Sequence, residues 1–141
     1  MKTFLDSGVL LTGWKGKDRE EAIAVMEDET REFVSSQLVR LELNPKAAFH
    51  KQSVELEFYR EHFGRVRKEE PLSEALGEEA FKLASRYGLA AADALNLAAA
   101  IRLGAQEFVT TEAPGKPMFR VREIKVTSLQ RSIPPVTSRG P

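Results

Sequence analysis

The chain has no cysteine, only two histidines and no net charge. The absence of cysteine excludes disulfides and thiolate metal sites, which fits a reducing cytoplasm, where we expect the protein to act. His50 and His62 lack the spacing of metal ligands, so a zinc site is disfavoured and both are expected on the surface of a helix. The 21 basic and 21 acidic residues cancel, so a site for a polyanion must be a local patch.

Long apolar runs are also missing. No stretch approaches the roughly 20 residues that a membrane span needs, and the N-terminal segment reaches Asp6 too early for a signal peptide. We therefore expect no membrane partner. A length of 141 residues with 42% hydrophobic side chains predicts one globular domain. We place this domain at residues 1–130, and expect residues 131–141, rich in Pro, Ser and Gly, to form a flexible tail.

Apolar patterns predict strands that alternate with helices. The expected strands are residues 2–6, 32–35, 107–111 and 124–129, with a weaker one at 65–70. The expected helices are 18–28, 71–87, 91–103 and one long helix over 36–62 that is kinked at Pro45 and stops at Gly64, while 13–17 is expected to be a loop. This alternation predicts an α/β fold with a mostly parallel central sheet of four to five strands and helices on both faces.

Four acidic residues stand where apolar residues are expected. Asp6 closes the first strand, Glu42 interrupts an apolar helix face, Asp93 lies in an Ala- and Leu-rich helix, and Glu112 follows the strand 107–111. A buried carboxylate is costly unless a cation compensates it, and few basic residues lie nearby in the sequence. Two of the acids follow strands, at the sheet edge where ligands bind in open α/β folds. Oxygen ligands of this kind favour Mg²⁺ or Mn²⁺.

Each acid also has an ordinary interpretation. Asp6 fits a residue that opens a turn, and Glu42 fits a solvated helix residue paired with a neighbouring base. Asp93 fits a helix cap, and acids such as Glu112 are common after strands. The metal-site hypothesis therefore depends on the joint pattern. Asn96 adds to it, because it shares a helix face with Asp93 and is placed to orient that carboxylate or a water.

Five short motifs occur in a fixed order along the chain. They are Phe4-Leu5-Asp6-Ser7, Val39-Arg40-Leu41-Glu42-Leu43, Pro71-Leu72-Ser73-Glu74-Ala75, Gly88-Leu89-Ala90-Ala91-Ala92-Asp93-Ala94-Leu95-Asn96 and Phe108-Val109-Thr110-Thr111-Glu112. Together they resemble a PIN domain, and most closely the VapC-type toxin ribonucleases, over residues 2 to 129. The resemblance implies a parallel sheet between helices, an acidic pocket for Mg²⁺ or Mn²⁺, cleavage of RNA, and often a homodimer neutralised by a small antitoxin.

The resemblance also assigns roles by position. Asp6, Glu42 and Asp93 correspond to the three principal acids of the family, which bind metal and take part in catalysis. Ser7 corresponds to the small hydroxyl residue beside the first acid, and Thr110 to the threonine of the last motif. Glu112 stands where the family more often has Asp. Its extra methylene implies that this fourth catalytic acid reaches the metal from a shifted backbone or through water.

Three functional hypotheses follow. The leading one is a metal-dependent endoribonuclease that acts as the toxin of a toxin–antitoxin pair, although a role in RNA processing fits the sequence equally. The alternative, prompted by Glu112, is a catalytically weakened PIN-like protein that holds RNA or a partner protein. The third is a helical scaffold with solvated acids, against which the lone Asp93 in its Ala-rich helix argues.

RNA binding near four carboxylates requires positive residues around the pocket. The candidates, each of which also fits an ordinary solvated charge, are Lys15, Lys17, Arg40, Lys116, Arg120 and Arg122. Trp14 fits either a base-stacking residue or half-buried packing. For a homodimer or antitoxin contact, we expect an apolar surface that includes Leu56, Phe58, Tyr59 and Phe63.

Overall fold

The computed structural model describes residues 1–130, so the predicted tail at 131–141 lies outside the described residues. One sheet contains five strands: β1 (Lys2–Leu5), β2 (Glu32–Ser36), β3 (Val66–Glu70), β4 (Glu107–Thr110) and β5 (Lys125–Ser128). All neighbouring strands are parallel, in the order β3-β2-β1-β4-β5. The predicted fold class is confirmed, including the weak strand expected near residues 65–70.

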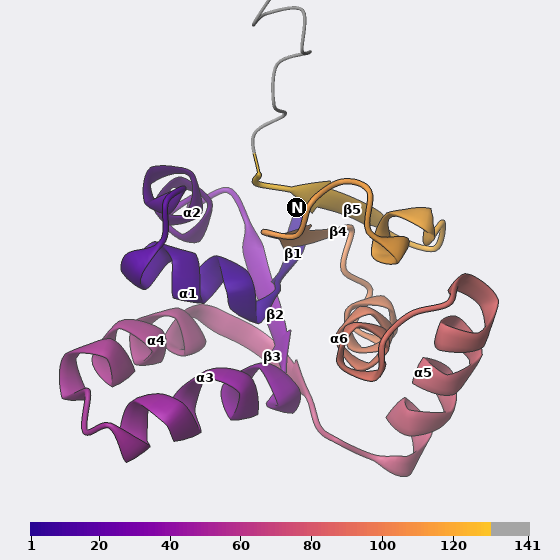
Figure 1. The fold of residues 1–141 in the computed structure, drawn as a ribbon, viewed down its shortest axis with the longest axis horizontal. Helices are drawn as coiled ribbons and strands as arrows, with labels where there is room; N and C mark the ends of the chain where they lie inside the picture. The colour runs from indigo at the N-terminus through magenta and orange to yellow at the C-terminus, as the bar shows by residue number, and fades with distance from the viewer. Residues whose placement is uncertain (131–141) are drawn as a thin grey trace, which may run out of the picture.

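Helices cover both faces of the sheet (Figure 1). On one side lie α1 (Ser7–Lys15), α2 (Arg19–Met26), α3 (Gln37–Phe49) and α4 (Ser53–Arg65). On the other side lie α5 (Glu74–Tyr87) and α6 (Ala91–Arg102), and a short 3₁₀ turn, η1 (Pro117–Arg120), connects β4 to β5. Within residues 1–130, no helix combines the length and apolar character that a membrane span requires.

The centre of the sheet is the most deeply buried part of the fold. Phe4 and Leu5 of β1 and Phe108 of β4 are fully buried, and the two phenylalanine rings stack with centroids 5.2 Å apart. Strands covered on both faces are expected to be apolar on both faces, as these are. Burying each such side chain stabilises the fold by about 1.5–3 kcal/mol. The residues that follow β1 and β4 are therefore held by rigid strands.

The loop predicted at 13–17 is largely helical, because α1 extends to Lys15. Gly13 lies within α1 where it packs against α2 and α4. A Cβ atom at Gly13 would lie 2.8 Å from Met26 Sδ and 3.2 Å from Phe58 Cζ. This glycine therefore permits close helix packing and does not form a turn.

The single long helix predicted over 36–62 is wrong. The chain forms α3 and α4, which are separated by a turn at 50–52, where Lys51 has the left-handed φ of 53°. Pro45 is accommodated inside α3, and α4 continues through Gly64 to Arg65. The turn lets α4 fold back beside α3, so that both helices pack on the same side of the sheet (Figure 1).

His62 is not at the surface, as the sequence suggested, but 2% exposed. Its ring packs edge-on against Phe33 and Phe63, and neither ring nitrogen has a hydrogen-bond partner among the described residues. Burial, helped by the charges of Arg65 and Arg40, lowers the pKa of His62 to about 4. The imidazole is therefore neutral at pH 7 and part of the core.

Two of the four residues predicted for an apolar docking surface on α4 are buried, whereas Leu56 and Phe58 are half-buried. Tyr59 is 0% and Phe63 7% exposed, because both side chains point into the core. Exposed apolar side chains occur instead on α3 and at the start of α4: Leu41 is 53%, Phe49 81% and Val54 69% exposed. Leu41 and Phe49 are eight residues apart and so lie on one face of α3.

Candidate metal centre

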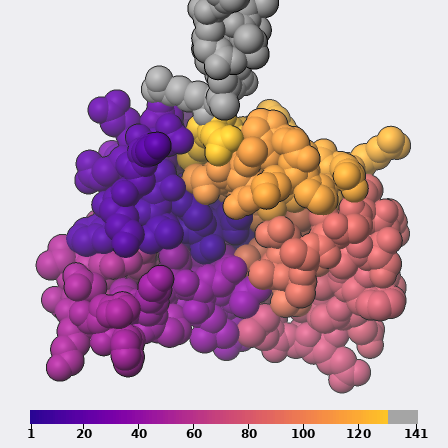
Figure 2. All heavy atoms as spheres, in the orientation of Figure 1, coloured from indigo at the N-terminus to yellow at the C-terminus, as the bar shows by residue number. Residues whose placement is uncertain are grey.

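The four predicted acids are carried by segments that lead to one edge of the sheet. Asp6 directly follows β1 and Glu112 follows β4 by two residues. The strand order reverses between β1 and β4, which is where ligands bind in open parallel sheets. Glu42 lies on α3, and Asp93 lies in the first turn of α6. Figure 2 shows the N-terminal segment, α3, α6 and the segment after β4 meeting in the middle of one face.

Asp6 is fixed by hydrogen bonds to both of its carboxylate oxygens. It is the N-cap of α1, where Ser7 N donates to Oδ1 at 2.9 Å. Thr110 Oγ1 donates to Oδ2 at 3.0 Å, and the same hydroxyl accepts from Glu112 N at 3.2 Å. Thr110 thus connects the side chain of Asp6 to the backbone of Glu112.

The electrostatic environment of Asp6 opposes its charge. Burial, together with the charges of Glu42 and Asp93, raises the pKa of Asp6 from 3.8 to about 6, against the two hydrogen bonds that favour the charged form. A carboxylate that remains partly protonated near neutral pH is one whose charge the protein itself does not compensate. Asp6 is therefore the acid with most to gain from a bound cation.

Glu42 is oriented by a chain of buried polar side chains. Asn96 is 1% exposed and donates through Nδ2 to Glu42 Oε1 at 3.0 Å. Its Oδ1 accepts from Ser36 Oγ at 2.6 Å, while Ser36 Oγ also caps α3 by accepting from Val39 N. The sequence indicated that Asn96 orients Asp93, but the structure places it on Glu42. The contribution of Ser36 was missed, because its contact with Asn96 joins residues that are 60 positions apart in the sequence.

Asp93 lies where the positive end of the α6 dipole favours an anion. Even so, burial raises its pKa, and the charge of Glu112 raises it further, while Lys116 acts in the opposite direction. Asp93 and Glu112 are therefore close enough to repel each other. Glu112 is exposed, but its backbone is fixed by Ser128 Oγ, which donates to the Glu112 carbonyl at 2.6 Å.

Gly8 is a second site residue that the sequence interpretation missed. A Cβ atom there would lie 2.4 Å from Thr111 Oγ1, closer than any side chain tolerates without movement of that threonine. Gly8 therefore lets the first turn of α1 approach the end of β4. The sequence signal was a glycine two residues after Asp6, which has no distinct meaning until β1 and β4 are known to be neighbours.

The four acids have the donor atoms and the unpaired charge that suit a divalent cation. Within residues 1–130, none of the four acids forms an ion pair with a lysine or arginine. Their donors are all oxygen, which suits Mg²⁺ or Mn²⁺. In the same range, no three acidic or histidine side chains converge at ligand distances. The residue types and the uncompensated charge fit a cation, and ligation requires the side chains to rotate inward.

The predicted RNA-binding lysines differ in their positions. Lys116 lies near Asp93, whose pKa it lowers. Lys15 is exposed at the end of α1 and lines a cavity between α1, α3 and α4. Lys17 is exposed in the connection to α2. Lys15 and Lys116 are therefore the lysines placed to meet a ligand beside the acids.

Two of the three predicted RNA-binding arginines, Arg40 and Arg120, are held by protein contacts. Arg40 pairs with Glu69, and its guanidinium lies 4.2 Å from the centroid of the Phe63 ring. Arg120 Nη1 donates to the Tyr87 carbonyl at 3.4 Å. These contacts connect α3 to β3 and η1 to α5, respectively, so they hold neighbouring elements together around the site.

A family model for the PIN domain matches residues 3–113. The chain therefore belongs to the PIN domain family, in agreement with the resemblance inferred from its motifs. No curated protein sequence matches the chain significantly.

Solved structures share the fold at low sequence identity. A toxin–antitoxin complex from Klebsiella pneumoniae has a TM-score of 0.72 and 19% identity, over 92% of this chain and 99% of that chain. VapBC2 from Rickettsia felis, bound to a promoter DNA fragment, has a TM-score of 0.68 and 14% identity, over 91% of this chain and 98% of that chain. VapBC-1 from nontypeable Haemophilus influenzae has a TM-score of 0.65 and 19% identity, over 92% of this chain and 98% of that chain. Two of these structural neighbours are thus VapBC proteins, and the third is a toxin–antitoxin complex.

Proposed function

We propose that the protein is a metal-dependent endoribonuclease that hydrolyses RNA phosphodiester bonds in the cytoplasm as the toxin of a toxin–antitoxin pair. The observation that carries the proposal is the charge cluster at the β1–β4 edge. The charges of Glu42 and Asp93 act on Asp6, and none of the three acids forms an ion pair within residues 1–130, although Lys116 lies near Asp93. Membership of the PIN family supports a nuclease, and the VapBC neighbours support a toxin.

In this proposal, Asp6, Glu42 and Asp93 hold Mg²⁺ or Mn²⁺. When bound, the cation supplies positive charge that activates water and stabilises the attacked phosphate. Thr110 and Ser7 N keep Asp6 in place, and Asn96 presents one oxygen of Glu42 while leaving the other free. The charge of Glu112 acts on Asp93 but is not among those that act on Asp6, so we assign Glu112 to the edge of the site, outside the direct ligands.

The test is cleavage of a generic single-stranded RNA by the full chain. With Mn²⁺ we expect endonucleolytic products, and with excess chelator none. We also expect Mn²⁺ to raise the melting temperature in a saturable manner, since binding to the folded state stabilises it. Saturable stabilisation without cleavage would select the weakened binding protein in place of the enzyme. Absence of both effects would overturn the metal-site proposal.

A small antitoxin and a second copy of the chain are the protein partners that we propose. The exposed apolar residues Leu41 and Phe49 on α3 support a protein contact on this face. We expect the wild type to sediment as a dimer at tens of micromolar, and Leu41→Lys with Phe49→Lys to sediment as a monomer. Phe81→Lys is the matched control, because Phe81 is 73% exposed on α5. A wild-type monomer would contradict the dimer.

A further inference from the structure

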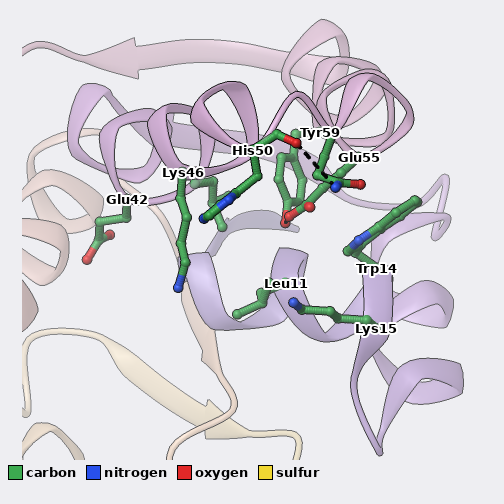
Figure 3. Close-up of a pocket in the computed structure, with 11 residues that line it drawn as sticks. Leu11, Trp14, Lys15, Glu42, Lys46, His50, Glu55 and Tyr59 are labelled. Atoms are coloured by element: carbon green, nitrogen blue, oxygen red, sulfur yellow. Dashed lines mark hydrogen bonds between the residues drawn. The ribbon is translucent and has the colours of Figure 1, made fainter.

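A cavity of about 620 Å³ lies between α1, α3 and α4, beside the acid cluster (Figure 3). Glu42 lines the cavity and also couples to Asp6, so the cavity and the candidate metal centre share a wall. The volume lies in the range of sites that enclose small organic ligands. A strand of substrate that passes the acids along α3 enters this space next.

The cavity is lined by two lysines and two glutamates, and neither lysine is in an ion pair with a described residue. Lys46 extends from α3 toward α1, and Lys15 projects from α1 below it (Figure 3). Within residues 1–130, neither ammonium group forms an ion pair or a hydrogen bond. The carboxylate of Glu55, which also lines the cavity, accepts the Tyr59 hydroxyl. The lysines are therefore free to bind an anion.

The charges are spaced along one helix face. Glu42, Lys46 and His50 follow one another at intervals of four residues, which place them on one side of α3 over roughly 12 Å. The acid lies at the end next to the metal centre, and the lysine lies one turn further on. This order suits a ligand with repeated negative charges, of which one is held by metal and the next by Lys46.

An aromatic surface lies at the far end of the cavity. Trp14 is partly exposed and packs its indole against Phe58 at a centroid distance of 5.7 Å and an interplanar angle of 48°. The contact with Phe58 holds the indole in place while it lines the cavity. A fixed, partly exposed indole beside free lysines is the combination that single-stranded nucleic acids bind, by stacking a base next to a neutralised phosphate.

We propose that this cavity is the subsite for the nucleotide next to the cleaved phosphodiester of a single-stranded RNA. Lys46 and Lys15 hold its phosphate, and Trp14 stacks on its base. The inference rests on the proposed ribonuclease function and assigns part of its substrate contact to residues outside the acid cluster. A protein segment is a poorer fit, because it would leave the two lysine charges without the regular phosphates that match them.

The experiment uses Trp14 as its own reporter, since it is the only tryptophan in the chain. A single-stranded RNA hexanucleotide of mixed sequence is titrated into full-length Asp93→Asn protein, a background chosen to prevent cleavage. We expect saturable quenching of the tryptophan fluorescence. Lys46→Gln and Lys15→Gln should each weaken binding about tenfold and reduce the salt dependence of the affinity by about one counterion. Lys82→Gln on α5 is the charge-matched control and should change affinity less than twofold.

Cleavage kinetics separate this proposal from the proposed function. In the active protein, Lys46→Gln should raise KM for RNA while kcat and the stabilisation by Mn²⁺ remain close to wild type. If Lys46→Gln cleaves RNA with an unchanged KM, the subsite proposal alone is overturned. If the wild type shows neither stabilisation by Mn²⁺ nor RNA cleavage, the ribonuclease proposal is overturned. Binding detected by anisotropy without a change in tryptophan fluorescence would also overturn the subsite. So would a Lys46→Gln variant that loses its dimer but keeps its RNA affinity, since the cavity would then belong to a protein contact.

Discussion

Replacing Asp93 with asparagine is expected to lower RNA cleavage by on the order of 100-fold or more, and replacing Asp6 with asparagine should do the same. Both side chains are partly buried at the β1–β4 edge, and burial is the first cause of the raised pKa of each. Asparagine keeps the size and the N-cap capacity of Asp6 but removes the charge. Single-turnover cleavage with saturating Mn²⁺ isolates the chemical step from product release.

The same assay should rank the other two acids. Glu42→Gln should behave like the aspartate variants, although part of its effect will come through the contact with Asn96. Glu112→Gln should have the smallest effect, because the charge of Glu112 acts on Asp93 but is not among those that act on Asp6. Glu78→Gln, an exposed acid on α5, is the control. An inactive Glu112→Gln beside a nearly fully active Asp6→Asn would show that the metal has been placed wrongly.

The second large effect is on stability without metal. A pKa raised from 3.8 to about 6 means that charged Asp6 costs the folded state on the order of 2–3 kcal/mol at pH 7, and less where water reaches it. In chelator, Asp6→Asn should therefore melt about 3–6 °C above the wild type. In Mn²⁺ the order should reverse, because the wild type gains a ligand that the variant binds weakly. A variant that melts lower than the wild type in chelator would instead make Asp6 structural.

The pH dependence provides an internal check of this prediction. Because the pKa of Asp6 is higher in the folded state, its ionisation lowers stability as pH rises from about 4 to 6. His62 acts in the opposite direction: its pKa falls from 6.5 to about 4 on folding, so stability is lost as pH falls through that interval. The two effects oppose each other in the wild type. In chelator, the melting temperature of Asp6→Asn should therefore fall more steeply on acidification than that of the wild type.

The sequence was sufficient for central strands β1 and β4, because each is a short buried run that is soon followed by an acid, Asp6 or Glu112. It failed where long-range packing outweighs local preference. Gly13 looked like a loop residue, but it is required by the neighbouring side chains of Met26 and Phe58. The turn between α3 and α4 has no glycine, and Lys51 adopts a left-handed conformation that no local pattern indicates.

The acids of the candidate site could be predicted from the sequence, but the side chains that orient them could not. The acids stood out because each interrupts an apolar pattern, which is visible in one dimension. The link from Ser36 through Asn96 to Glu42 joins residues that are 60 and 54 positions apart, so it exists only after the sheet has formed. The burial of His62 likewise depends on α4 folding back over Phe33.

The strand order has a consequence for the time at which the site appears during synthesis. Central strand β1 pairs with β4 in a register that joins Thr3 to Glu107, 104 positions apart. Until β4 has been made, β1 has one open edge, and Asp6 lacks both Thr110 and the acid of the following segment. Such distant pairing is slow, and it postpones the complete acid cluster until β4 and Glu112 have been synthesised. For a nuclease, this order keeps the growing chain inert toward the messenger and ribosome that are producing it.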